Sequence, residues 1–543
     1  MADVRASSPS EQSPLLPSSQ QDEEPAASHI SIFRGIAIAF FMELLILIQT
    51  TNISMMTTAQ SAIAVDLDAF DQATWFTSAY LGDFDQIAAS SVTPLTGRLA
   101  AIFTPRVYVI FASTTLAIGL FLSAAALTLP VFLLGRAIAG LGSGGLMSIA
   151  IILAVDLASP KRRGLCIGMI NAGYTTGLAS GAVLAGLMVS SLGWRLLFWI
   201  QAPAAIVLGP LLFLAIPPPS SACASLDSRT LMQILWRVDY AGALALALSV
   251  VLLLSSLASP TVLIWPLPLA AVSFLIFILI ESRWTTEPVI PVRLLRSRAV
   301  LMTCVAGLGL MMARWAVLFY SPVYALAVRG WSPASAGLIL VPTNAGFGSG
   351  GLLVGWLHIR KSASYYHSCL IIFVLFAATT LALSWLSTPD SPVALYITMT
   401  FLNGLFAGSL MNYTLSHVLH LTSSEVHYIV SSLIAMSRGF AGSFGSAVAG
   451  GFFTRVLKKA LETGFAQHNI TPNSKLIRTL LGSPVTVMSL TGAERQIAIQ
   501  GYEHAVRMLF IGGSVIALSA TAFQAATGWT PEAERKNQPD HAA

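Results

Sequence analysis

The chain has 543 residues, of which 55% are hydrophobic and only 10% are charged. Soluble domains carry about 25% charged residues, so this composition excludes a soluble fold. The formal net charge is +5, but the basic residues lie mostly in short segments between apolar runs. That distribution is typical of membrane topology and not of nucleic-acid binding. The composition therefore predicts an all-α polytopic membrane protein with no nucleic-acid partner.

Residues 1–30 are rich in Ser, Pro, Gln and Glu, which predicts a disordered cytosolic tail and contains no signal-peptide pattern. Within it, Glu11 stands four residues before Leu15 and Leu16. This spacing resembles an acidic dileucine signal, which a sorting adaptor would read and which would direct a fungal protein to the vacuole. A chance match within a polar tail is the alternative.

Apolar runs of about 20 residues recur after this tail, and a helix of that length crosses the roughly 30 Å hydrocarbon core of a bilayer. An even number of spans places both termini on one side of the membrane. The sequence predicts fourteen spans, at residues 36–58, 73–96, 107–127, 130–155, 165–190, 196–216, 239–258, 262–281, 300–326, 335–357, 366–386, 393–418, 428–453 and 506–528.

The loops between these spans predict the orientation. Loops on the side of the termini are basic, as in Lys161, Arg162 and Arg163, whereas residues 65–71 on the opposite side are acidic. The positive-inside rule therefore places the termini in the cytosol. The long loop at residues 454–505 is basic too, but long loops count little in this rule. It contains Asn469 in an Asn-Ile-Thr sequon, a candidate glycosylation site on the non-cytosolic side.

Several motifs follow one another along the spans in a characteristic order. They include 97-GRLAAIFTPR-106 after the second span, 135-GRAIAGLGSGG-145 in the fourth, 173-GYTTGLASG-181 in the fifth and 193-GWRLLFWIQAP-203 at the start of the sixth. In this order they make residues 40–528 resemble the major facilitator superfamily, specifically its fourteen-span drug:proton antiporter branch.

The resemblance implies a major facilitator fold with two six-helix halves plus two extra central helices. The expected divisions are a tail at residues 1–32, an N-terminal half at 33–216, a linker with the two extra spans at 217–282, a C-terminal half at 283–528 that includes the loop 454–505, and a cytosolic tail at 529–543. A weak internal repeat agrees with duplicated halves, because a Gly-x-Leu triplet at residues 97–99 recurs at 355–357. We expect a monomer in membrane lipid.

Three polar residues at membrane depth, Arg136, Glu43 and Asn52, are candidates for proton or substrate coupling. A charge there costs several kcal/mol, about 3 on insertion scales, so Arg136 in the fourth span is expected to face a cavity or a partner, or to snorkel to the interface. Glu43 is the only carboxylate in the first span and could bind and release a proton; a neighbouring helix that satisfies it is the alternative. The resemblance gives Arg136 the coupling role.

Two departures from the branch pattern weaken the expectation of proton coupling. Asn52 stands where the branch usually has an Asp, and an amide can form hydrogen bonds but cannot titrate. Ala101 replaces the usual acidic residue of the signature loop. Passive or differently coupled transport therefore remains an alternative.

Glycines in the fifth span predict close helix packing. Gly173, Gly177 and Gly181 are four residues apart and so line one helix face, where small residues let helix backbones approach in lipid. The resemblance implies that they form a seal between helices of the two halves, and ordinary small-residue packing is the alternative. Gly97 and Arg98 of the signature loop are expected to take part in gating.

The second span contains two aspartates, Asp83 and Asp85, in the stretch AYLGDFDQIAAS. Without residues 82–86 the span would have the spacing of the family, and five extra residues would rotate one part of the helix against the other by about 140°. Three interpretations compete: a functional insertion that carries coupling carboxylates, an alternative splice form or gene-model error, and a tolerated bulge at a water cavity. On a helix the two side chains point about 200° apart.

The binding cavity is expected near the midplane, between the two halves. The candidate lining residues are Trp75, Tyr80, Trp315, Tyr324, Asn344, Asn403 and Asn412, each with a purely structural role as the alternative. Arg314 and Arg438 also lie in predicted spans, so each of them, like Arg136, could have a functional or a purely structural role.

The sequence contains no protease, hydrolase or nucleotide-binding motif, and its four cysteines are scattered without metal or disulfide spacing. We therefore expect no enzyme activity, no cofactor and no metal. The expected function is secondary active transport of a small-molecule substrate with protons, with basic amino acids at the fungal vacuolar membrane favoured by the resemblance and the dileucine pattern. Multidrug or toxin efflux at the plasma membrane is the alternative, and a non-transporting nutrient sensor is a third possibility.

Overall fold

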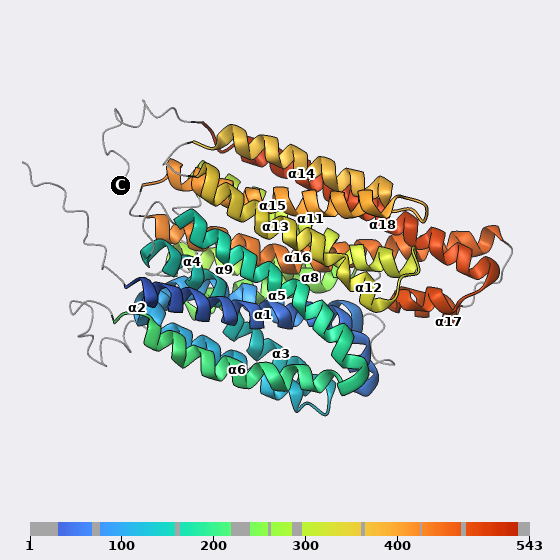
Figure 1. Ribbon diagram of the computed structural model, residues 1–543, viewed down its shortest axis with the longest axis horizontal. Helices are drawn as coiled ribbons and strands as arrows, with labels where there is room; N and C mark the ends of the chain where they lie inside the picture. Colours follow the sequence, from blue (N-terminus) through green and yellow to red (C-terminus); the bar gives the residue numbers. More distant parts are fainter. Residues whose placement is uncertain are drawn as a thin grey trace, which may run out of the picture.

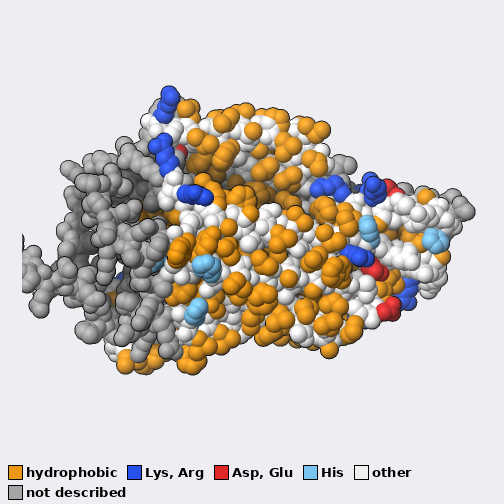
Figure 2. All heavy atoms as spheres, turned by 90° about the horizontal axis from the view of Figure 1, so that it is seen from above, with side chains coloured by type: hydrophobic (Ala, Val, Ile, Leu, Met, Phe, Trp, Pro, Cys, Tyr) orange, Lys and Arg blue, Asp and Glu red, His pale blue; other side chains and the backbone are white. Residues whose placement is uncertain are grey.

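The computed structural model describes residues 31–67, 76–157, 163–218, 239–258, 262–284, 296–359, 364–423, 426–468 and 474–529. All regular elements within these ranges are helices, and they form an elongated bundle (Figure 1). Apolar side chains cover the middle of the face in Figure 2, and charged side chains lie toward its two ends. This distribution fits a bundle that crosses a membrane, as the composition predicts.

The first half of the chain supplies six labelled helices. α2 runs through two predicted spans. Thr104, with φ 67° and ψ 148°, is the one residue within it whose backbone angles are not helical. α3 and α4 together form the predicted fourth span. The bounds are α1 Ile32–Asp66, α2 Phe76–Ala124, α3 Leu129–Ser143, α4 Leu146–Leu157, α5 Arg163–Leu192 and α6 Trp194–Ala215.

The second half follows two helices that pack against each other, α8 (Tyr240–Ala258) and α9 (Pro266–Leu279), the latter extended by η1 (Ile280–Trp284). α8 contacts both α2 and α16, so it lies beside the boundary between the halves. The remaining elements are α11 Arg298–Ala327, α12 Pro333–Leu338, α13 Leu340–Leu353, η2 Val354–His358, α14 Tyr366–Leu386, α15 Val393–Leu421, α16 His427–Gln467, α17 Ser474–Gly482, η4 Pro484–Ser489 and α18 Gly492–Ala525.

Twelve helical segments within the described ranges are long and apolar enough to cross a membrane. They match twelve of the fourteen predicted spans. The two others, 73–96 and 428–453, fall on the first part of α2 and on α16, which are helical but are not among the twelve. The all-α membrane architecture is thus confirmed, and the number fourteen stays a prediction.

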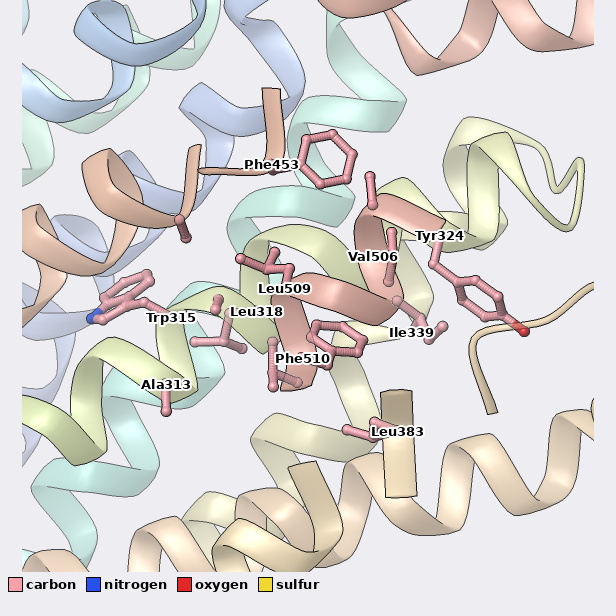
Figure 3. Packing of buried hydrophobic residues seen from close by; sticks show 14 of the residues in the cluster. Ala313, Trp315, Leu318, Tyr324, Ile339, Leu383, Phe453, Val506, Leu509 and Phe510 are labelled. Atoms are coloured by element: carbon pink, nitrogen blue, oxygen red, sulfur yellow. The ribbon is translucent and has the colours of Figure 1, made fainter. Parts of the chain in front are cut away.

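Each half packs around its own core. The core of the first half includes Leu116 and Phe198. In the second half, side chains from α11, α14, α16 and α18 converge, among them Leu383, Phe453 and Phe510 (Figure 3). Because apolar lipid supplies no hydrophobic force between helices, such cores are held by close packing and by polar contacts between helices.

The halves meet mainly where α5 contacts α13 and where α2 contacts α16. Three side chains of the first half reach the second at this boundary. Ile53 and Leu178 belong to the core of the second half, and Tyr174 packs against the cores of both halves. The boundary is therefore closely packed at the level of these residues.

The segment at residues 454–505, expected as a long loop between two spans, contains helices that form a cap. α16 continues to Gln467, α17 and η4 follow, and α18 already begins at Gly492. The cap folds because it buries its own apolar residues, including Phe465, Leu480 and Ile497, and burial from water is worth about 1.5–3 kcal/mol for each such side chain. In Figure 1 the cap projects from the end of the bundle opposite the one where α1 begins and α18 ends.

Candidate functional site

Arg136 is tied to another helix within the first half. Its side chain is 0% exposed, and its Nη1 donates a hydrogen bond to Asn52 Oδ1 over 2.6 Å. The guanidinium carbon also lies 5.9 Å from the centre of the Phe198 ring. A side chain without any exposed surface does not snorkel, so that alternative is wrong. The bond connects α3 to α1 through an uncharged partner.

Glu43 lies on α1 against the glycine stripe of α5. Its Oε2 atom is buried and has no hydrogen-bond partner within the described residues. A Cβ atom placed on Gly173 would overlap with that oxygen. The glycine therefore creates the space in which the carboxyl group lies, and Oε2 receives no hydrogen bond there.

The rest of the stripe contacts the same helix. A Cβ on Gly177 would overlap with Thr50, and one on Gly181 would lie 2.5 Å from Thr51 O. Thr51 Oγ1 in turn donates a hydrogen bond to Gly177 O over 3.2 Å. The three glycines thus join α5 to α1 within the first half. The expectation that they seal the two halves against each other is wrong in this respect, because the stripe faces α1.

A different face of α5 makes the contact with the second half. A Cβ on Gly348 of α13 would lie 3.4 Å from Thr175 Oγ1, and one on Gly168 of α5 would lie 3.2 Å from Gly351 O. These are ordinary or slightly tight contacts, in contrast to the overlaps along the glycine stripe. Small residues on both helices therefore let the halves approach without interlocking side chains at these positions.

The second half holds a further buried Arg–Asn pair. Arg314 on α11 is 3% exposed, and its Nη2 donates to Asn344 Oδ1 over 3.2 Å. Its guanidinium carbon lies 4.1 Å from the centre of the Phe347 ring. Tyr174, from α5 of the first half, lies within electrostatic range of the guanidinium. This pair therefore lies at the boundary between the halves.

The sequence does not predict the pairing of Arg314 with Asn344, although each residue is conspicuous on its own as a polar side chain in a predicted span. The two residues are 30 positions apart on different helices, and sequence spacing does not reveal how two helices are rotated against each other. The available signal was the charge itself, because an ionised residue at membrane depth predicts a nearby partner.

Three other candidate lining residues make contacts within the second half. Asn403 donates to the hydroxyls of Thr379 and Thr380. Asn412 donates to Gly351 O over 2.5 Å. Trp315 stacks on Phe319, with 5.2 Å between the ring centres. These contacts join helices or fill the core.

Tyr324 lies near the cap and not at the midplane. Its hydroxyl lies 2.9 Å from Thr388 O and accepts a hydrogen bond from Arg329 Nε over 2.8 Å. Its ring stacks on Tyr396 with 4.6 Å between the centres. The expected position in a midplane cavity is therefore wrong for Tyr324, because its polar end is bound to the connection between α14 and α15.

Several predicted site residues fall outside the described part of the chain. They are Glu11, Leu15, Leu16, Trp75 and Asn469. α2 is helical through residues 82–86, but the side chains of the five predicted site residues that it carries are outside the described part. These five are Tyr80, Asp83, Asp85, Gly97 and Arg98. Within the described residues, His, Cys, Asp and Glu form no group that could hold a metal ion.

Comparison with known proteins connects this geometry to a family. The model of the Major Facilitator Superfamily matches residues 42–446. Efflux pump apf11 of Gibberella fujikuroi is 25% identical over 534 residues, covering 93% of this chain and 90% of the relative. Vacuolar basic amino acid transporter 1 of Saccharomyces cerevisiae is 25% identical over 352 residues, covering 64% and 62%.

A solved structure shares the fold. It is the crystal structure of a bacterial homologue of the human lysosomal transporter Spinster, in an inward-facing and occupied conformation. The TM-score is 0.57 at 14% sequence identity, with coverage of 92% of this chain and 100% of that one. At this identity the likeness concerns the fold alone.

Proposed function

Because this chain belongs to the major facilitator superfamily of membrane transporters, we propose that it exports small organic molecules by secondary active transport. The proposal is supported above all by the arrangement of the two halves around their common boundary. Each half has its own core, and each holds a buried Arg–Asn pair beside residues that reach across that boundary. Substrate sites of such carriers lie between two halves that rock against each other.

The contacts between α5 and α13 are suited to such rocking. A Cβ added to the glycines at this contact would make ordinary or slightly tight contacts, without the overlap seen along the glycine stripe. Within the first half, by contrast, α1 fits into the glycine stripe of α5 so closely that a single added methyl group would overlap. The proposal is that the first half moves as one body while the contact between halves opens.

Export is supported by relatives whose matches cover most of the chain. Efflux pump apf11 covers 93% of it, whereas the vacuolar basic amino acid transporter covers 64%. The plasma membrane is the matching location for an exporter.

Proton coupling is part of the proposal and rests on Glu43. Among the described carboxyl groups, Glu43 lies in a membrane span of the first half and has a buried oxygen without a hydrogen-bond partner. A carboxyl group in that position can carry a proton in its neutral form. Asn52 cannot do so, which leaves Glu43 as the proposed proton carrier of this half.

Uptake by purified protein in liposomes tests the proposal. When the interior of the liposomes is acidic, an antiporter accumulates substrate inside while protons leave. Ethidium serves as the probe for drug export. We expect uptake that collapses with an ionophore and that is lost in Glu43→Gln. Glu462→Gln is the matched control, because Glu462 is an exposed carboxylate on the cap near Lys458. Binding of probe without any uptake would indicate a sensor instead of a carrier.

A second candidate function is the transport of basic amino acids into the vacuole. Its support is the named amino acid transporter among the relatives and the pattern of Glu11, Leu15 and Leu16, which an adaptor would read. The same liposomes with radiolabelled lysine separate the two candidates. A tagged protein with Leu15→Ala and Leu16→Ala should leave the vacuolar membrane if this function is correct.

A further inference from the structure

The Arg314–Asn344 pair presents hydrogen-bond donors without acceptors. Arg314 Nη1 and Asn344 Nδ2 are buried and have no hydrogen-bond partner within the described residues. An arginine side chain has no acceptor, and the Asn344 carbonyl oxygen already accepts the bond from Arg314 Nη2. Both atoms of the pair that lack a partner are donors, so what the pair still requires is an acceptor.

The charge of Arg314 also lacks a counter-charge. No ion pair with a described carboxylate involves Arg314, which instead contacts an amide oxygen and the face of Phe347. Buried charges are normally paired, because leaving water costs several kcal/mol for each ion. By comparison, Arg438 in the same half donates to Met411 O over 2.9 Å and to Thr414 Oγ1 over 3.0 Å.

The unpaired donors lie where opening of the carrier would expose them. Tyr174 of the first half packs against both cores and is within electrostatic range of Arg314. Both residues of the pair are 3% exposed in the closed arrangement. Separation of α5 from α13 would remove Tyr174 and leave one cation and two N–H donors at the boundary.

We propose that Arg314 and Asn344 bind a carboxylate of the transported molecule, an inference that rests on the transport function proposed above. A carboxylate offers two acceptor oxygens for the two free donors. Its single negative charge balances the single cation, whereas a phosphate monoester would bring more charge than this cation neutralises. Among the molecules that the carrier transports, this site favours those with a carboxylate, such as small organic acids and amino acids.

The test compares acids with their amides in binding to the purified, full-length protein. The probes are 4-phenylbutyrate with 4-phenylbutyramide, and L-lysine with L-lysinamide. The unfolding temperature of the protein is measured at increasing concentrations of each probe, because a ligand that binds the folded state stabilises it. The first pair tests an organic acid and the second an amino acid. Binding is measured without a gradient, so the result is separate from that of the uptake experiment.

We expect at least one acid to stabilise the protein at about tenfold lower concentration than its amide, as loss of a hydrogen bond to a charged group implies. Arg314→Gln should abolish this preference. Arg438→Gln is the matched control: it removes a buried arginine whose donors are used inside the protein, so the preference should persist. Asn344→Asp places a carboxylate beside Arg314 and should keep the protein folded while it removes the preference.

Several results would overturn the inference. These are equal affinities of acid and amide in the wild type, no stabilisation by either acid, or a preference that persists in Asn344→Asp. If Arg314→Gln does not fold, Asn344→Asp decides alone. Ethidium uptake that continues while the acids fail to bind would reject the carboxylate site and leave the transport function standing.

Discussion

Asn52 and Arg136 are 84 residues apart in the chain, and a hydrogen bond of 2.6 Å joins them inside the first half. Both are buried, with exposed fractions of 1% and 0%. The arginine therefore fixes α3 against α1 through an amide that carries no charge. A position that resembles a proton site in the sequence acts in the structure as the acceptor for a neighbouring arginine.

Asn52→Leu should destabilise the protein by about 1–3 kcal/mol, because it removes the acceptor of a buried charged donor. Asn52→Asp keeps an acceptor oxygen and should retain most of the stability. The measurement is thermal unfolding of the purified variants. Equal stability of the Asn52→Leu and wild-type proteins would contradict the role given to this bond.

Alanine at Gly177 or Gly181 should destabilise the first half by about 1–3 kcal/mol, because overpacking forces backbones apart. The added Cβ overlaps with Thr50 in one case and approaches Thr51 O in the other. Thermal unfolding and expression level measure the effect. Gly186→Ala on the same helix is the matched control, because no atom lies within 4 Å of its Cβ position. It should be neutral or stabilising. A similar loss in all three variants would show that the α1 contact is not the cause.

The sequence is sufficient to predict the helical membrane architecture, because runs of apolar residues are a local property. The spacing of the glycines likewise predicts a close contact for one face of α5. It does not predict which helix lies there, since α1 and α13 both present small residues and only their rotation in three dimensions decides. The same limit explains the Arg314–Asn344 pair. The sequence does not predict the helical cap for another reason, because its segments are too polar to be spans. Their burial depends on contacts between distant residues, such as the hydrogen bond from the Tyr502 hydroxyl to Leu480 O.

Tyr324→Phe should lower stability without weakening substrate binding. The hydroxyl connects Arg329 to the segment between α14 and α15, and its loss removes hydrogen bonds worth about 0.5–1.5 kcal/mol each. Hydrogen exchange of residues 386–392 should become faster. Ser335→Ala, at an exposed hydroxyl near the same end of the bundle, controls for general effects of hydroxyl loss. A raised half-saturation concentration for ethidium uptake in Tyr324→Phe would instead indicate that Tyr324 contacts the substrate.

Thr104→Gly should stabilise the protein. Thr104 has φ 67° and ψ 148° within α2, a region of backbone conformation that is essentially reserved for glycine, and such strain costs about 1–3 kcal/mol. Glycine relieves it, although the gain is reduced because glycine makes the unfolded chain more flexible. Thr104→Ala separates the two effects: it removes the hydroxyl and one methyl group but keeps the Cβ atom, so the strain remains. We expect the unfolding temperature to rise for Thr104→Gly and to stay or fall for Thr104→Ala. An equal rise in both variants would assign the effect to the side chain and not to the backbone.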